Sequence, residues 1–138
     1  MNQPAQLGVQ KIQTMLERFA DAFTHGDGKG AAECWDVPAL VVSDDGVKAV
    51  SETAEVEAFF GGAAEQYNSK GITGTRPEIL EVDWLTDRLA SVRVRWPYLG
   101  DDGRPKKGSE SSSYVVRNDD QGAPKIVTAI MLGAKAGR

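Results

Sequence analysis

The sequence contains little cysteine and little histidine, and this scarcity excludes several kinds of site. A single cysteine, Cys34, cannot form a disulfide within the chain, and with the one histidine, His25, it falls short of a zinc-binding set. The glycine-rich segment 26–30 follows a predicted helix rather than a strand, so it is not a dinucleotide-binding loop. We therefore expect neither a metal nor a cofactor.

Basic residues and long apolar runs are scarce as well. The sequence has sixteen Lys and Arg residues and twenty Asp and Glu residues, which gives a net charge of -4. Nucleic-acid binding needs clustered basic side chains, so this balance does not favour it. No apolar run approaches the roughly 18 residues of a membrane-spanning helix. Residues 1–8 lack the basic and apolar regions of a secretory signal. We expect a cytoplasmic protein that has no nucleic-acid or membrane partner.

Length and composition are those of an ordinary globular domain. The chain has 138 residues, of which 41% are hydrophobic and 26% charged. This length fits one domain. We expect a single domain over residues 1–138, with its core at about 8–132 and a loose tail at 133–138, where the residues are small or basic.

The first half of the sequence has helical periodicity. Apolar residues between Val9 and Phe23 form one stripe at helical spacing, which ends at the glycine-rich segment 26–30. A short second helix is predicted at about 31–35, because Pro38 disfavours helix in the residues before it. A third helix begins at Ser51 or Thr53 and continues with helical spacing to Tyr67.

Strand signals surround the third helix. Segments 39–42 and 47–50 flank an Asp-Gly turn at 43–46, which predicts a hairpin. From residue 80 onward apolar and polar residues alternate, and turn residues separate the runs, which predicts antiparallel strands. The class is therefore α+β: a curved antiparallel sheet is wrapped around a long helix, and three helices lie in the N-terminal half.

A curved sheet around a helix leaves a cone, and a cone that side chains fill incompletely is a ligand pocket. Tyr98, Tyr114 and Ser112 would supply polar groups to a mostly apolar cavity. We expect Leu80, Trp84, Val94 and Tyr114 to point inward, toward the third helix, around a hollow that contains no acid beside a hydroxyl donor. The predicted pocket residues are Phe19, Trp35, Phe59, Trp84, Trp96, Tyr98, Ser112 and Tyr114.

The order of these elements resembles a known superfamily. The long helix, the Gly26-Asp27 turn, the short helix that ends at Trp35, the hairpin, the third helix and four strands resemble the nuclear transport factor 2-like fold. Within it, the chain is most similar to SnoaL-like and ketosteroid-isomerase-like domains, over about residues 8–132. The resemblance implies a cone-shaped, cystatin-like barrel and commonly a homodimer built on the outer face of the sheet. Members include isomerases, polyketide cyclases, dehydratases, accessory subunits and binding domains without catalysis.

The catalytic residues of the isomerase-like members do not carry over. The resemblance implies an acidic base on the strand after the short helix and a tyrosine in the first helix. Alignment on Gly26-Asp27 places Ser43 and Phe19 at these positions, and neither can do this chemistry. A slip of one residue would substitute Asp44, which we interpret as a turn residue. The catalytic residues stay unknown.

Two other reactive residues have ordinary structural interpretations. His25 falls in the last turn of the first helix, where an imidazole interacts favourably with the helix dipole. Cys34 is interpreted as a small packed thiol rather than a nucleophile.

Three functions stay open. In the first, the domain is a homodimer that binds a small apolar or aromatic ligand without catalysis. In the second, it is an isomerase, cyclase or dehydratase that uses Asp44 or Asp36 as base and Tyr98 or Tyr114 as proton donor. In the third, a sheet face recruits another protein.

The polar face of the predicted sheet carries charges on neighbouring strands. Arg93 and Arg95 could pair with Glu81 and Asp83 across these strands. This pattern suits a solvated, salt-bridged face and a dimer surface equally well.

Overall fold

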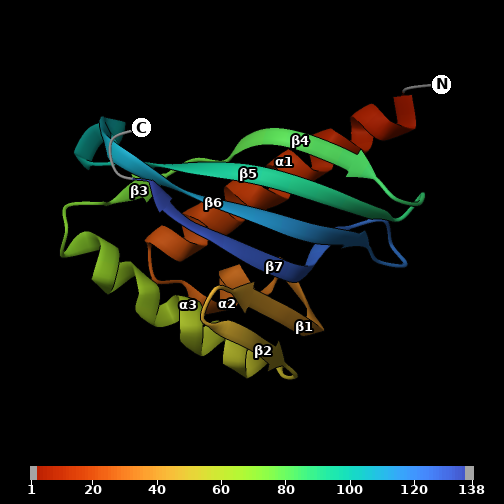
Figure 1. Ribbon diagram of the computed structural model, residues 1–138, viewed down its shortest axis with the longest axis horizontal. Helices are drawn as coiled ribbons and strands as arrows, with labels where there is room; N and C mark the ends of the chain where they lie inside the picture. Colours follow the sequence, from red (N-terminus) through yellow and green to blue (C-terminus); the bar gives the residue numbers. More distant parts are fainter. Residues whose placement is uncertain (1–2, 136–138) are drawn as a thin grey trace.

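The structure, a computed structural model that describes residues 3–135, places helices mainly in the first half of the chain and long strands in the second (Figure 1). Its elements follow one another in this order: α1 (Gln3–Thr24), α2 (Gly28–Ala32), β1 (Trp35–Ser43), β2 (Gly46–Val50), α3 (Thr53–Asn68), β3 (Gly74–Thr75), β4 (Glu78–Trp84), β5 (Leu89–Leu99), a single 3-10 turn (Asp101–Gly103), β6 (Pro105–Asn118) and β7 (Pro124–Lys135). The predicted hairpin is β1–β2.

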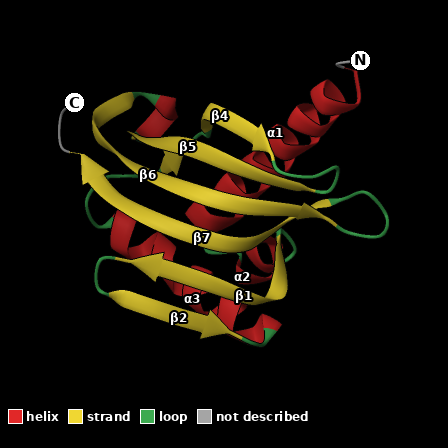
Figure 2. Ribbon diagram, turned by 45° about the vertical axis from the view of Figure 1, so that its right-hand side comes forward, coloured by secondary structure: helices red, strands yellow, loops and turns green. Residues whose placement is uncertain are grey.

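The strands form one curved sheet in the order β2-β1-β7-β6-β5-β3, and β4 also pairs with β5. Strands β4 to β7 are antiparallel neighbours, as expected from their short connections. Strand β1 joins β7 in parallel, so the sheet is mixed at this edge. The helices lie on one face of the sheet (Figure 2). The predicted α+β fold, a curved sheet around a long helix, is confirmed.

The core forms between the apolar stripe of α1 and the inner face of the sheet. Ile12 and Leu16 on α1 are fully buried, as are Val92 and Val94 on β5 and Ile126 on β7. The stripe predicted from the sequence is therefore the buried face of α1, and its other face is polar and solvated. No helix within residues 3–135 is long and apolar enough to cross a membrane.

Helix α2 begins earlier than predicted, and helix α3 begins at Thr53, as predicted, but has a different capping residue. The side chain of Asp27 accepts a hydrogen bond from the Gly30 amide at 3.0 Å, so α2 begins at Gly28 rather than at about residue 31. Helix α3 is capped by Glu52 rather than Ser51 or Thr53, through a capping box with Glu55. In both cases an acidic side chain satisfies the free amides at the helix start.

Two predictions about the sheet are wrong. Leu80 points outward and is 56% exposed, because the register of β4 shifts between Ile79 and Glu81 and a bulge turns Leu80 to the outer face. The predicted tail also begins too early. Strand β7 continues to Lys135, where it pairs with Ser109 of β6, and residues 136–138 lie outside the described part of the chain.

Candidate functional site

A cavity of about 210 Å³ lies between helices α1 and α3 and the inner face of the sheet. Nine of the ten aromatic residues of the protein line it. They come from different elements, because the apolar stripes of two helices and the inward parity of β1, β5 and β6 converge here. These residues are Phe19, Phe23, Trp35, Phe59, Phe60, Tyr67, Trp96, Tyr98 and Tyr114.

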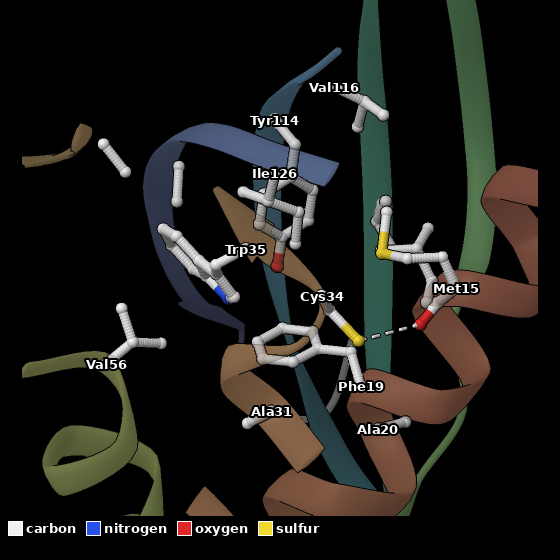
Figure 3. Packing of buried hydrophobic residues seen from close by; sticks show 14 of the residues in the cluster. Met15, Phe19, Ala20, Ala31, Cys34, Trp35, Val56, Tyr114, Val116 and Ile126 are labelled. Atoms are coloured by element: carbon white, nitrogen blue, oxygen red, sulfur yellow. Dashed lines mark hydrogen bonds between the residues drawn. The ribbon is translucent and has the colours of Figure 1, made fainter. Parts of the chain in front are cut away.

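The Phe19 ring packs edge to face against Trp35, Phe60 and Trp96, whereas other ring pairs in the cavity wall are tilted. The ring of Phe19 lies 4.9 Å from Phe60 and 6.1 Å from Trp96, measured between centroids, with interplanar angles of 85° and 75°. Figure 3 shows Phe19 between Trp35 and the α1 backbone, with Tyr114 approaching from the sheet. Edge-to-face contacts are more favourable than an exact face-to-face sandwich of two rings, and they fix the orientation of each ring. The cavity therefore has a preformed wall.

Seven of the eight predicted pocket residues line this cavity, and Trp84 does not. Strand β4 lies beyond β5 at the edge of the sheet, where the first part of α1 covers it. A Cβ atom added at Gly8 would lie 2.6 Å from the Trp84 ring, so the ring packs directly against α1. Phe59 is 59% exposed, which places it at the edge of the cavity rather than in its depth.

Of the polar groups predicted on the sheet face, Tyr114 forms a hydrogen bond with a neighbouring tryptophan. The Trp96 indole N–H donates to the Tyr114 hydroxyl at 3.0 Å. Burial raises the pKa of Tyr114 to about 12, so its hydroxyl keeps its proton at neutral pH. The indole N–H groups of Trp35 and Trp84, by contrast, are buried without a hydrogen-bond partner among the described residues.

The cavity also contains an acid beside a hydroxyl donor, contrary to expectation. The Tyr67 hydroxyl on α3 lies 2.8 Å from both carboxylate oxygens of Glu110 on β6 and donates to them. Burial and this hydrogen bond hold the pKa of Tyr67 far above its ordinary value. Burial and the nearby Glu110 charge raise the pKa of Tyr98 to about 12. Both tyrosines therefore stay protonated donors beside the carboxylate.

The sequence contained a signal for this pair. Glu110 has the same strand parity as Ser112 and Tyr114, two residues that were assigned to the pocket, so extending the alternation two residues backward reaches it. Tyr67 is the last member of the apolar stripe of α3. Residues 109–113 are mostly serine and carry almost no hydrophobic contrast, so the alternation is weak at Glu110.

The acids proposed from the sequence are elsewhere. Asp44 is exposed in the β1–β2 turn, Asp36 is half-buried on β1, and neither lines the cavity. His25 is exposed, with its Nδ1 2.7 Å from the Asp21 carbonyl oxygen. An enzyme that uses Asp44 or Asp36 as its base therefore does not fit this geometry.

Cys34 is a packed thiol, as interpreted. It is buried, and its Sγ donates to the Met15 carbonyl at 3.6 Å (Figure 3). Burial raises the pKa of Cys34 from 9.0 to about 11, which suppresses the nucleophilic thiolate.

The charged outer face matches the prediction in part, because Arg93 lies opposite Glu81 as expected but Arg95 has a different partner. Arg95 forms an ion pair with Glu78 at 2.6 Å, rather than with Glu81 or Asp83. The register places Glu81 opposite Arg93 and Asp83 opposite Ser91. These residues lie on the side of the sheet away from the cavity.

In the part of the chain that the structure describes, His, Cys, Asp and Glu side chains form no group of three that could hold a metal ion.

Solved structures share this architecture at low sequence identity. A domain of unknown function with a cystatin-like fold from Nostoc punctiforme PCC 73102 is 21% identical, with a TM-score of 0.66 over 91% of this chain and 76% of that chain. A putative scytalone dehydratase from Novosphingobium aromaticivorans DSM 12444 is 13% identical, with a TM-score of 0.66 over 100% and 93% of the two chains. A ketosteroid isomerase-like protein from Erwinia carotovora atroseptica SCRI1043 is 13% identical, with a TM-score of 0.61 over 87% and 91%.

These likenesses show that the fold is cystatin-like. Residues 10–133 match the family described as NTF2-like protein (DUF6841), and the chain belongs to that family. The resemblance inferred from the sequence is confirmed. No curated protein matches the chain.

Proposed function

We propose that the domain binds a small, mostly apolar or aromatic molecule in this cavity. The observation that carries the proposal is the concentration of nine of the ten aromatic residues around one hollow of about 210 Å³. An apolar cavity of about 150 Å³ accommodates benzene. The hollow therefore suits a ligand with one ring and a short substituent.

The chemistry of the lining supports the same conclusion. Packed aromatic side chains offer a large apolar surface whose ordering is already complete before the ligand arrives, so little conformational entropy is lost on binding. A few polar groups in an apolar pocket then fix the orientation of the ligand. Here the Tyr67–Glu110 pair and the Trp96–Tyr114 pair supply those groups.

Binding of 2-phenylethanol, measured by titration calorimetry and ligand-observed NMR, tests the proposal. Ala63 on α3 is half-buried and lines the cavity, whereas Ala58 on the same helix is exposed and does not. We expect Ala63→Phe to fill part of the hollow and weaken binding at least tenfold, and Ala58→Phe to leave it unchanged. Circular dichroism checks that both variants fold. Equal binding by the two variants would place the ligand elsewhere, and no binding to the unmodified protein would reject the proposal.

A second candidate, an enzyme that moves a proton on a small hydrophobic substrate, is favoured by one observation. Glu110 is a carboxylate in the cavity, and Tyr67 beside it carries a proton at neutral pH. A carboxylate in this setting can act as a base toward an acidic C–H group. Exchange of the α-hydrogens of acetophenone for deuterium in D₂O, followed by NMR, tests this. The enzyme hypothesis requires faster exchange with the protein and its loss in Glu110→Gln.

We also propose that two copies associate through the outer face of the sheet. Leu40 on β1 and Ile130 and Leu132 on β7 are large apolar side chains with 42%, 36% and 48% of their surface exposed. Val42 pairs with Ile130 in the register and continues this outer apolar patch. Exposed apolar surface of this kind is typical of protein interfaces. A second copy offers the same surface, and a twofold dimer would cover both.

A further inference from the structure

One end of the cavity combines a carboxylate with aromatic rings. Glu110 lies opposite Trp96 in the β5–β6 register, and its side chain faces into the cavity, half-buried. Tyr67 donates to both of its oxygens, and the Tyr67 ring is 5.2 Å from Phe23 and 6.4 Å from Tyr98, between centroids. The carboxylate thus lies beside Tyr67, in a cavity that Phe23 and Tyr98 also line.

Among residues 8–133, whose side chains the structure describes, no basic side chain forms an ion pair with Glu110. The two ion pairs found there use Glu78 and Asp120. The other charged groups that line the cavity, Lys48 and Glu55, are both exposed, and their formal charges sum to zero. Glu110 therefore gives the cavity lining a net formal charge of one negative unit. Tyr67 uses part of the acceptor capacity of this carboxylate, which has about four lone-pair sites and can still accept from a ligand.

We infer that the ligand is a small protonated amine that carries one aromatic or apolar ring. A carboxylate supplies the charge partner and hydrogen-bond acceptor for an ammonium group, and aromatic faces attract the same cation through their quadrupoles. The remaining apolar lining receives the ring. An anionic ligand of the same shape would be repelled by the Glu110 carboxylate. A neutral alcohol would form a weaker hydrogen bond with that carboxylate than an ammonium group does. This inference rests on the proposed ligand-binding function and names its substrate class.

Three probes of matched shape separate charge from apolar fit: 2-phenylethylammonium, 2-phenylethanol and phenylacetate. Titration calorimetry at pH 7 should show 2-phenylethylammonium binding about tenfold or more tightly than 2-phenylethanol, because the ammonium adds a positive charge to the hydrogen bond that it donates to the carboxylate. Phenylacetate should bind most weakly. In Glu110→Gln, which keeps the shape of the side chain, the ammonium and the alcohol should bind alike.

Two further variants give the controls. Tyr67→Phe keeps the carboxylate and should retain the preference for the ammonium probe. Glu65→Gln removes a charge from the exposed face of α3, outside the cavity, and should change nothing. If 2-phenylethanol binds as tightly as 2-phenylethylammonium, or if Glu110→Gln keeps the preference, the inference about the amine fails while ligand binding stands. If none of the three probes binds, both fail.

Discussion

At the scale of single residues, burial decides which side chains can react. Cys34 and Tyr114 have reactive groups by type, but each is buried and each keeps its proton well above neutral pH. The Tyr67–Glu110 pair differs, because its carboxylate is half-buried and lines a cavity. Cys34 and His25 are candidate reactive residues by residue type alone. Glu110 is the better candidate for binding or catalysis, because its side chain lines the cavity.

Cys34 gives a pH-dependent prediction. Burial raises the pKa of this thiol from 9.0 to about 11, so the folded protein holds the proton more tightly than the unfolded chain does. The stability from this group is complete below pH 9 and is lost as the pH rises toward 11, on the order of 3 kcal/mol in total. Urea unfolding at pH 8, 9 and 10 should show a decline that is smaller in Cys34→Ala.

The reactivity of the same thiol gives an independent check. In the folded protein at pH 8, Cys34 should react with Ellman's reagent far more slowly than in urea, because its Sγ is packed against the Met15 carbonyl. Rapid reaction of the folded protein would show that the thiol is accessible and would contradict its assigned burial.

At the scale of elements, the helices meet at glycines. Helix α2 crosses α3 so closely that a Cβ atom at Gly28 would overlap the backbone carbonyl of Glu57. Gly61 on α3 faces the same contact, 3.9 Å from the Gly28 Cα atom when a Cβ is added to it. A backbone carbonyl cannot move aside as the end of a flexible side chain can, so the position needs glycine.

Substitution of two glycines by alanine tests this contact. Gly28→Ala should destabilise the fold by roughly 1–3 kcal/mol, because α2 and α3 must separate. Gly62→Ala, also on α3 but exposed and with nothing within 4 Å of an added Cβ, should stabilise it by about 0.5–1 kcal/mol through helix propensity. Urea unfolding midpoints measure both. A neutral Gly28→Ala would show that the two helices can separate without cost.

Periodicity predicted the elements, and local side-chain chemistry set their details. The apolar stripe of α1 and the alternation of β5 predicted correctly which faces are buried, because many apolar residues recur at regular spacing in each element. The capping by Asp27 and Glu52 and the bulge at Leu80 depend on single residues and on the neighbouring strand. A single-residue shift in β4 leaves the composition of the strand unchanged, so the sequence pattern could not distinguish Ile79 from Leu80 as the inward residue.

At the scale of the whole molecule, a cavity results where two helices and a curved sheet cannot fill the space that they enclose. Seven of the eight expected lining residues were identified from parity and helical spacing. Trp84 was misplaced because the position of β4 at the sheet edge depends on strand order, which alternation does not specify. Glu110 was missed because the serine-rich run 109–113 hides its parity.

The proposed dimer is tested at this scale. Ile130→Lys places a charge in the outer apolar patch and should convert a dimer to a monomer, as measured by sedimentation or light scattering with size-exclusion chromatography. Leu85→Lys is the matched control, because Leu85 is 56% exposed in the β4–β5 turn, away from the patch. A monomeric unmodified protein, or a dimer that survives Ile130→Lys, would rule out this interface.

The three tryptophans give the most direct test of the cavity as the binding site. In ¹H–¹⁵N NMR spectra, each indole N–H gives a separate signal. Trp35 and Trp96 line the cavity and Trp84 packs outside it against α1. Addition of 2-phenylethanol should shift the signals of Trp35 and Trp96 progressively and leave that of Trp84 in place. Three unmoved signals, or a shift confined to Trp84, would contradict the proposal that this aromatic hollow binds the ligand.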